Sequence, residues 1–301
     1  MRREDGSGMI GNRLFTMETR VSATTTAEDA ATAQALLIQR NRGTNLPPPP
    51  QWNQVLETIL NHRSVRGFLP DALPEGTLET LVAAAQSAST SSNLQVWSVV
   101  AVQEPDRKSR VATLASNQQF IRDAPLLLVW LADLARLNAI AADRQLTVEG
   151  TQFTEAFILG IVDATLAAQN AFVAAESLGL GAVYIGAMRN HPEKVAAELG
   201  LPPHVFAVFG MAVGWPDPAK ATGIKPRLPQ DVVLHRETYD ATPKRQTIDR
   251  YNEIARDYMR EQGMKEQDWT TQATNRLKDR EAMHGRDRMR EALRNLGFAL
   301  K

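Results

Sequence analysis

The sequence predicts an α+β fold in which a mostly antiparallel sheet is flanked by helices on both faces. Short apolar runs of strand length are few and unevenly spaced, and segments with apolar residues at helical spacing lie between them. One long segment, 152–178, is apolar on nearly every side, as in a buried core helix or an oligomer interface. The sequence has no glycine-rich turn between a strand and a helix, so a nucleotide cofactor would not be bound as in a Rossmann domain.

The N-terminal part differs in composition from the rest of the chain. Residues 1–45 are rich in Thr, Ala, Arg and Asp and have little apolar periodicity, and a run of prolines at 47–50 forms a stiff spacer after them. The stretch 27–40 could form a helix, but nothing in its sequence suggests a function. We therefore predict a disordered tail over 1–45.

The first regular elements follow the prolines. Apolar residues at helical spacing predict helices over 52–61 and 74–87. The segment 96–102 is predicted to be a strand, followed by a turn at Glu104-Pro105-Asp106. The continuous apolar run 125–131 has the length of a strand and is most simply a buried central one.

The second half begins with the long helix predicted over 152–178, which a Gly-Leu-Gly sequence ends. Strands are predicted over 182–185 and 205–213, and Gly214-Trp215-Pro216 ends the last of them. From about residue 247 the sequence is polar, helical and rich in arginine. We therefore place a core domain at 46–245 and a helical extension, packed on the core or on a partner subunit, at 246–301.

The composition excludes several classes of protein. Lys plus Arg and Asp plus Glu number 34 each, so the net charge is zero and no extended nucleic-acid interface is indicated. The absence of cysteine excludes disulfides, thiolate metal sites and a cysteine nucleophile, and it suits a reducing cytoplasm. The five histidines show no metal-ligand spacing. The longest apolar run, 124–132, is too short to span a membrane.

Two short basic clusters are the main indication of function. His62-Arg63-Ser64-Val65-Arg66 lies near the start of the core, and Lys225-Pro226-Arg227 lies near its end. A phosphorylated cofactor requires charge-assisted donors from several directions, and arginine supplies two at once. Taken singly, the first cluster could simply complement the dipole at a helix C-terminus, and the second could be a solvated surface pair.

Two further segments could line a site. The run 88–95 consists of small hydroxyl and amide residues with one leucine, and it could equally be a plain polar loop. Tyr184-Ile185-Gly186-Ala187 ends a predicted strand, where small residues would let a planar ligand approach the backbone. The alternative for this second segment is an ordinary strand end.

In their order and spacing these segments resemble the FMN-dependent nitroreductase family. The resemblance rests on His-Arg-Ser-x-Arg, the Ser/Thr-rich loop ending in Leu-Gln, the sequence 174–186, Gly-Trp-Pro at 214–216 and Lys-Pro-Arg at 225–227. The resemblance covers about residues 50–245. Within the family, the segments resemble the NADPH-preferring, oxygen-insensitive nitroreductase and flavin reductase subgroup. It implies a nitroreductase-like fold and a homodimer with two FMN sites at the subunit interface, where the long helix packs against its partner.

The resemblance also assigns residues. The implied FMN-binding residues are His62, Arg63, Ser64, Arg66, Thr90, Ser91, Gln118, Tyr184, Ile185, Gly186, Ala187, Lys225 and Arg227. The loop that carries Thr90 and Ser91 comes from the partner subunit in this family. The residues implied at the opening for substrate and pyridine nucleotide are Ser92, Arg189 and Lys265. No metal is implied.

The implied activity is reduction of nitroaromatics, quinones or similar acceptors by NADPH or NADH through FMN. Electrons would pass in pairs, in a ping-pong cycle of hydride transfers at flavin N5, so no side chain is expected to act as a nucleophile. An alternative is an NAD(P)H:FMN reductase that supplies reduced flavin to a separate monooxygenase. A further alternative is a flavin-binding sensor or storage protein without turnover.

This sequence departs from the family pattern at two places. Ala187 replaces what is usually a second glycine, and its methyl group is expected to narrow the space near the ring. At the mobile loop where relatives hold the 2′-phosphate of NADPH with arginine, this chain has Lys265 followed by Glu266 and, after one residue, Asp268. Acids repel a phosphate, so the preference for NADPH over NADH should be reduced, although Arg256, Arg260 and Arg276 could contribute.

Overall fold

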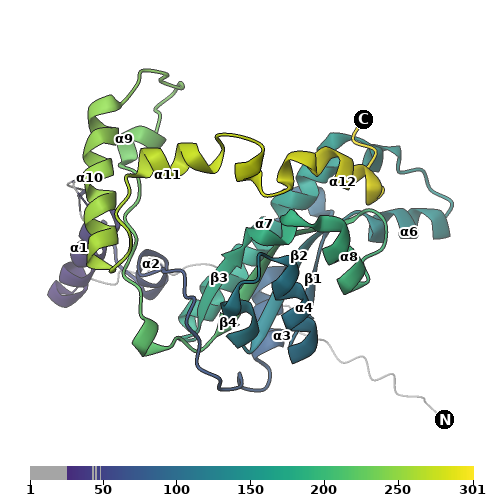
Figure 1. The fold of residues 1–301 in the computed structure, drawn as a ribbon, viewed down its shortest axis with the longest axis horizontal. Coiled ribbons are helices and arrows are strands. Elements are labelled where there is room, and N and C mark those ends of the chain that lie inside the picture. The colour runs from purple at the N-terminus through teal and green to yellow at the C-terminus, as the bar shows by residue number, and fades with distance from the viewer. Residues whose placement is uncertain (1–25, 43, 45, 48) are drawn as a thin grey trace, which may run out of the picture.

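The computed structural model describes residues 26–42, 44, 46–47 and 49–301, which are arranged around one antiparallel sheet (Figure 1). Within these residues the sheet has four strands in the order β1-β2-β4-β3. The strands are β1 (Trp97–Val102), β2 (Leu126–Asp133), β3 (Gly181–Ile185) and β4 (Val205–Gly214). The apolar run at 125–131 is therefore a central strand, as predicted, and all eight residues of β2 are buried.

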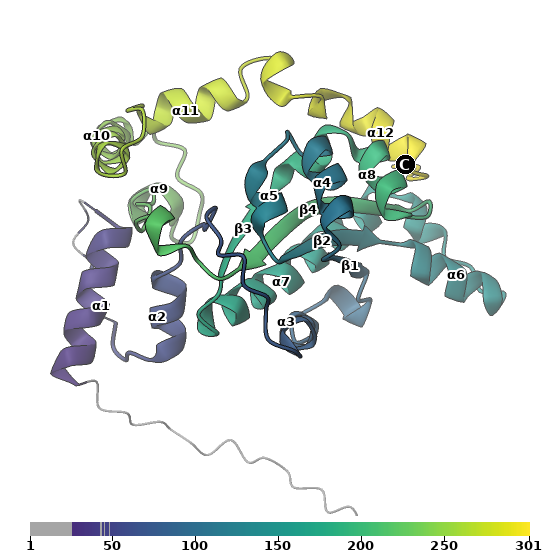
Figure 2. The same ribbon diagram turned by 60° about the horizontal axis from the view of Figure 1, so that its bottom comes forward.

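Helices cover both faces of the sheet (Figure 2). The residues of β2 alternate between two cores, because successive side chains of a strand point to opposite faces. On one face Leu126, Leu128 and Trp130 pack with α3 (Thr77–Gln86) and α7 (Thr154–Ser177). On the other face α4 (Pro105–Leu114), α5 (Gln119–Asp123) and α8 (Pro192–Leu199) complete the core. This arrangement confirms the predicted α+β fold.

Helix α7 lies unusually close to the sheet at one point. A Cβ atom built on Gly160 would be 2.9 Å from the Cβ of Ala132 on β2 and 3.4 Å from the carbonyl oxygen of Val96. Glycine is therefore required at this crossing. The close approach brings the next turn of α7, which carries the buried Asp163, against the start of β1.

The opposite face of α7 is exposed in the single chain. Ile158, Val162 and Leu166 are 48%, 44% and 42% exposed and follow one another at intervals of one helical turn. By length and composition alone α7 could also cross a membrane. Its inner face, however, is built into the core, with eight buried residues.

One predicted turn is the start of a helix. The carboxylate of Glu104 accepts hydrogen bonds from the backbone N–H groups of Asp106 and Arg107, at 2.7 and 2.5 Å, and Pro105 occupies the first turn of α4. A side-chain cap and a proline are as typical of a helix N-terminus as of a turn. The segment predicted as a turn is therefore the first turn of α4, a helix that the sequence analysis did not identify.

The predicted disorder over 1–45 is wrong for α1 (Ala27–Arg40), while residues 1–25 lie outside the described residues. Thr26 and Asp29 form a reciprocal capping box at its start. Ala33 and Leu36 pack with Trp52 and Ile224, so the few apolar residues of α1 have a partner in the core. Helix α1 lies beside α2 (Gln54–Leu60) (Figure 2).

The C-terminal extension is helical and packs on the core. Its helices are α10 (Arg245–Glu261), α11 (Trp269–Arg276) and α12 (Met289–Asn295), and they run from the side of α1 across the molecule to α8 (Figure 1). At the far end Leu293 and Phe298 join Phe206 in a core cluster. The short helices α6 (Ala135–Asp143) and α9 (Gln230–Val233) complete the described fold. The domain limits at residues 46 and 245 remain predictions.

Candidate functional site

The two basic segments meet in space. His62–Arg66 follows α2 and runs beside the start of β3, where the Val65 N–H donates to the carbonyl oxygen of Ala182 at 3.0 Å. The second segment follows Thr222, whose hydroxyl donates to the carbonyl oxygen of Ser64 at 3.4 Å. Two clusters that are far apart in the sequence therefore form one cationic surface, as a phosphate site requires.

The cations of this surface repel one another. Burial lowers the pKa of Lys225, and the neighbouring Arg227 and Arg66 lower it further. No ion pair among the described residues includes Arg63, Arg66, Lys225 or Arg227. Because no ion pair within the described residues neutralises these side chains, a dianionic ligand would be favoured here.

His62 is held in place by the long helix. Its Nδ1 lies 2.8 Å from Oε1 of Glu176 on α7, and the Arg63 N–H donates to the same oxygen at 3.4 Å. The imidazole also packs edge-on against Phe172, with ring centroids 5.0 Å apart. Beside it lies a pocket of about 270 Å³, lined by Arg40, Ile59, Leu60, His62, Gln169, Val173, Glu176 and Arg227.

Most side chains of the strand end at 184–187 pack inside the protein. The Tyr184 hydroxyl donates to Gln169 at 3.3 Å, its ring packs between Phe172 and Phe209, and burial raises its pKa. Ile185 and Ala187 are buried in the core. The methyl group of Ala187 therefore packs inside the fold, and the expectation that it narrows the site is not supported.

A second group of cations surrounds Gly186, at the start of the 3₁₀ turn Gly186–Asn190. A Cβ built on Gly186 would lie 3.3 Å from Nη2 of Arg189 and 3.7 Å from Nη1 of Arg286. Burial is the main cause that lowers the pKa of Arg286 to about 10, and Arg189 and Arg276 add to the effect. Arg286 is fixed by a 2.8 Å hydrogen bond to Oδ1 of Asn190.

The loop with Thr90, Ser91 and Ser92 lies elsewhere in the chain. Asp163 of α7 accepts hydrogen bonds from the Thr90 hydroxyl at 2.5 Å and from the Ser91 N–H at 3.2 Å. Asp163 precedes Glu176 by 13 residues, which at about 1.5 Å per residue places the two about 20 Å apart along α7. A single chain therefore does not bring this loop to the His62 cluster.

Gln118 follows a segment that contacts the Gly186–Asn190 turn. Its side-chain amide donates to the carbonyl oxygen of Ala115 at 2.8 Å, and the neighbouring Ser116 hydroxyl accepts a hydrogen bond of 2.8 Å from Asn190. Ser116 therefore links this segment to the turn, and the expected contact of Gln118 with the flavin ring stays a prediction.

Comparison with known proteins identifies the family of this chain. The model described as "Nitroreductase family" matches residues 59–215, and the model "Nitroreductase family, C-terminal domain" matches residues 225–301. The chain belongs to the nitroreductase family. The resemblance inferred from the sequence is therefore confirmed.

Several curated relatives are similar to this chain over most of their length. A Bacillus subtilis (strain 168) protein named FMN reductase (NADPH) is 40% identical over 244 residues, which are 79% of this chain and 97% of the relative. An oxygen-insensitive NADPH nitroreductase of Salmonella typhimurium is 37% identical over 203 residues, 67% of this chain and 81% of the relative.

Solved structures agree with the fold. The NADPH:FMN oxidoreductase from Vibrio harveyi, complexed with NAD+, superimposes with a TM-score of 0.74 at 34% identity, over 83% of this chain and 100% of that one. Nitroreductase A from Vibrio parahaemolyticus superimposes with a TM-score of 0.75 at 35% identity, over 83% and 100%. The fold around the two cationic groups is thus the nitroreductase fold.

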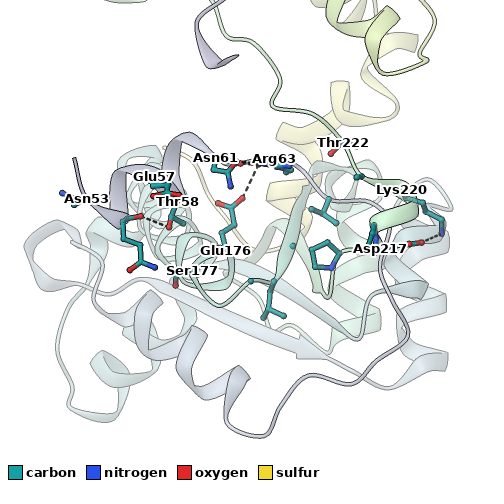
Figure 3. Close-up of a pocket in the computed structure, with 18 of the residues that line it drawn as sticks. Asn53, Glu57, Thr58, Asn61, Arg63, Glu176, Ser177, Asp217, Lys220 and Thr222 are labelled. Carbon is teal, nitrogen blue, oxygen red and sulfur yellow. Dashed lines mark hydrogen bonds and ion pairs between the residues drawn. The ribbon is translucent and has the colours of Figure 1, made fainter. Parts of the chain in front are cut away.

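A large cleft borders the cationic surface at Arg63 (Figure 3). It measures about 730 Å³ and lies between α1, α2, the end of α7 and the loop 216–222. Its charged lining consists of Asp29, Glu57, Glu176, Asp217, Arg63 and Lys220. Lys220 is 3.5 Å from Asp217, so acidic groups predominate and the cleft is poorly suited to a phosphate.

The structure also places the loop predicted to contact the pyridine nucleotide. Lys265 is exposed, and its neighbour Glu266 forms a forked ion pair with Arg260, with both N–O distances 2.9 Å. Arg260 is therefore already bound to an acid within the nitroreductase chain. No group of three or more His, Cys, Asp or Glu side chains able to hold a metal occurs in the described part of the chain.

Sequence interpretation missed Arg286 and Asp163. Arg286 lies in a polar, arginine-rich extension where no local feature separates a half-buried arginine from the exposed ones. Asp163 did carry a signal, because it is the single acid in the apolar middle of the long helix. A carboxylate at such a position must be satisfied by hydrogen bonds, and here it holds the Thr90 loop.

Proposed function

We propose that this chain is an FMN-dependent NAD(P)H oxidoreductase that reduces nitroaromatics, quinones or similar small acceptors. The observation that carries the proposal is the surface of Arg66, Lys225 and Arg227, three neighbouring cations that form no ion pair within the described residues. Family membership and the names of the relatives support it. The donor set fits FMN, because its phosphate is a dianion and its ring is planar and can lie against backbone at Gly186.

The chain's own residues would act by binding and orienting. His62, fixed by Glu176, and the cations at 225 and 227 would bind the phosphate. The backbone at Gly186 would face the ring, and Gln118, two residues after the Ser116 that contacts the same turn, would approach the ring as well. Bound FMN would supply acceptance and donation of hydride. Arg189 and Arg286 would bind an anionic or electron-rich group of the substrate beside Gly186, which orients it for reaction.

The test is to purify the protein and mix it anaerobically with NADPH or NADH. We expect a yellow protein with about one FMN per chain, whose visible flavin absorbance is bleached by the nucleotide and recovers when a quinone is added. A colourless preparation that ignores added FMN would overturn the proposal. Bound FMN that neither nucleotide can bleach would instead indicate a flavin-binding protein without turnover.

Relatives named FMN reductase and NADPH-flavin oxidoreductase favour a second candidate, an enzyme that releases reduced flavin to a monooxygenase. Retention of FMN distinguishes the two. A flavin that is lost on dialysis, with FMN itself showing saturation as a substrate, would favour the reductase. A flavin that stays bound through many turnovers would favour the nitroreductase activity.

We infer that the functional unit is a homodimer built on α7. The exposed apolar face of Ile158, Val162 and Leu166 supports this, because a second copy would remove it from water. The distance of about 20 Å between the Thr90 loop and the His62 cluster along α7 also supports it. A partner would supply Thr90, Ser91 and Ser92 to each site.

Replacing Val162 with aspartate should convert the dimer into monomers, because a charge would be buried in an apolar interface. The molar mass measured by light scattering should fall from about twice the chain mass of 33.2 kDa to that mass itself. Bound FMN should be lost as well. Val233→Asp is the matched control, since Val233 is 61% exposed on α9 and should leave the mass unchanged. If the Val162→Asp variant stays dimeric, the dimer interface does not include this face of α7.

We also predict that NADPH is preferred over NADH by less than about 30-fold in kcat/KM, or roughly 2 kcal/mol. The reason is that Glu266 occupies Arg260 and lies beside Lys265. Replacing Glu266 with glutamine should release Arg260 and raise the ratio several-fold. Steady-state rates with both donors on one quinone measure it, with Glu253→Gln, an exposed acid on α10, as the control. A wild-type ratio in the hundreds would show that another cation binds the phosphate.

The compartment and the other partners belong to the same proposal. The absence of cysteine fits a reducing cytoplasm, and the zero net charge gives no sign of a nucleic-acid partner. We therefore propose a cytoplasmic enzyme that acts on small molecules, with no membrane or nucleic-acid partner.

A further inference from the structure

Helix α1 lies before the residues that the family model matches, which begin at 59, yet it reaches the cationic surface. Its last residue, Arg40, is only 8% exposed. The Arg40 guanidinium donates from Nη1 to the carbonyl oxygen of Lys225 at 2.9 Å, and from Nη2 to Leu60 at 3.0 Å and to His62. One buried side chain therefore joins both basic segments.

The connection runs in both directions. The Arg227 N–H donates to the carbonyl oxygen of Arg40 at 2.9 Å. Both ends of the Lys225–Arg227 segment are thus bonded to Arg40, one through its side chain and the other through its backbone. The planar fork of arginine makes this possible, because its donors point in fixed directions toward several acceptors.

Helix α1 is itself fixed, so Arg40 is held in a rigid frame. Its inner face packs on Trp52 and Ile224. Arg42, just after the helix, pairs with Glu261 of α10 at 2.7 Å. The same helix α10 holds the second basic segment, since the Tyr251 hydroxyl donates to the carbonyl oxygen of Pro226 at 2.9 Å.

Arg40 also changes the charge at the site. Leu60 ends α2, and the last carbonyl groups of a helix carry partial negative charge that would repel a phosphate. Arg40 binds one of these oxygens. Burial lowers its own pKa to about 10, with Arg227 as the largest charge effect, so the guanidinium remains charged at neutral pH beside the other cations.

We propose that Arg40 is a positioning residue for the flavin phosphate, contributed by a helix outside the part matched by the family model. By joining the His62–Arg66 and Lys225–Arg227 segments it sets the preference of this site for FMN over riboflavin. The inference rests on the proposed FMN-binding function.

The test is the affinity of the full-length protein for FMN and for riboflavin, measured by quenching of flavin fluorescence after bound flavin has been removed. Arg40→Met keeps the apolar length of the side chain and removes its charge and donors. We expect it to weaken FMN binding by about tenfold or more while riboflavin binding changes by less than about threefold. Arg40→Lys keeps the charge without the planar fork of donors, so its affinity for FMN should lie between those of Arg40→Met and the wild type.

Arg236→Met is the control, because Arg236 is an exposed arginine that belongs to neither basic cluster and contributes no contact that fixes α1. It should leave the FMN-to-riboflavin ratio unchanged. Equal weakening of both flavins by Arg40→Met, or no weakening, would overturn the inference. So would loss of folded protein in both Arg40 variants, since Arg40 would then serve stability alone. A wild-type protein that binds neither flavin would instead overturn the proposed function.

Discussion

Replacing Asp163 with alanine should lower the free energy of unfolding by about 3 kcal/mol or more. Asp163 is 1% exposed and accepts hydrogen bonds from the Thr90 hydroxyl and from the N–H groups of Ser91 and Val96. Alanine would leave these donors, one of them fully buried, without an acceptor. The loop at 90–96 would lose its attachment to α7, so FMN binding should fall as well.

Urea unfolding at one fixed protein concentration measures the effect, because a dimer's apparent stability depends on concentration. Glu155→Ala is the control, since Glu155 is an exposed acid on the same helix and its loss should cost less than about 1 kcal/mol. Asp163→Asn, which keeps one acceptor oxygen, should be intermediate. If Asp163→Ala and Glu155→Ala are equally stable, Asp163 does not hold the loop.

Replacing Arg227 with alanine should weaken FMN binding by about 1.5–3 kcal/mol, the range for a lost hydrogen bond to a charged group. Arg227 lies beside Lys225 and Arg40 and is in no ion pair with a carboxylate of the described residues, so its charge is available to a phosphate. Riboflavin, which has no phosphate, should bind almost as well as before. The affinities come from fluorescence titration at two salt concentrations.

Raising the salt should weaken FMN binding to the wild type more than to the Arg227→Ala variant, because an exposed cation is screened by ions. Arg236→Ala is the control, since Arg236 is an exposed arginine of the segment that follows and belongs to neither basic cluster. If the Arg227→Ala variant binds FMN with wild-type affinity, the phosphate is not bound by Arg227.

Much of the fold could be predicted because strong local patterns coincide with elements. The apolar run of β2 and the long helix α7 were identified within a few residues. The failures have physical causes. The sequence Glu104-Pro105-Asp106 suits both a turn and a helix start. Helix α1 is too weakly apolar to be stable alone, and the sequence does not show that Ala33 and Leu36 meet Trp52.

Only those residues of the candidate site that belong to a sequence motif could be predicted. The structure brings the two basic segments together, while their role in binding a phosphate stays a prediction. Arg286 and Arg40 could not be found in this way. Each reaches the site from a helical extension, so its position depends on tertiary packing rather than on its neighbours in the sequence.

The contact between Gly160 and Ala132 constrains how this protein can evolve. The two positions share one volume, since a methyl group at Gly160 would be 2.9 Å from the one already present on Ala132. A lineage can enlarge one side chain only where the other shrinks, so the positions should vary together among descendants. A larger residue at either position would push α7 away from the sheet and separate Asp163 from the N–H of Val96. Selection for flavin binding would therefore act on both positions, although neither residue needs to contact the flavin.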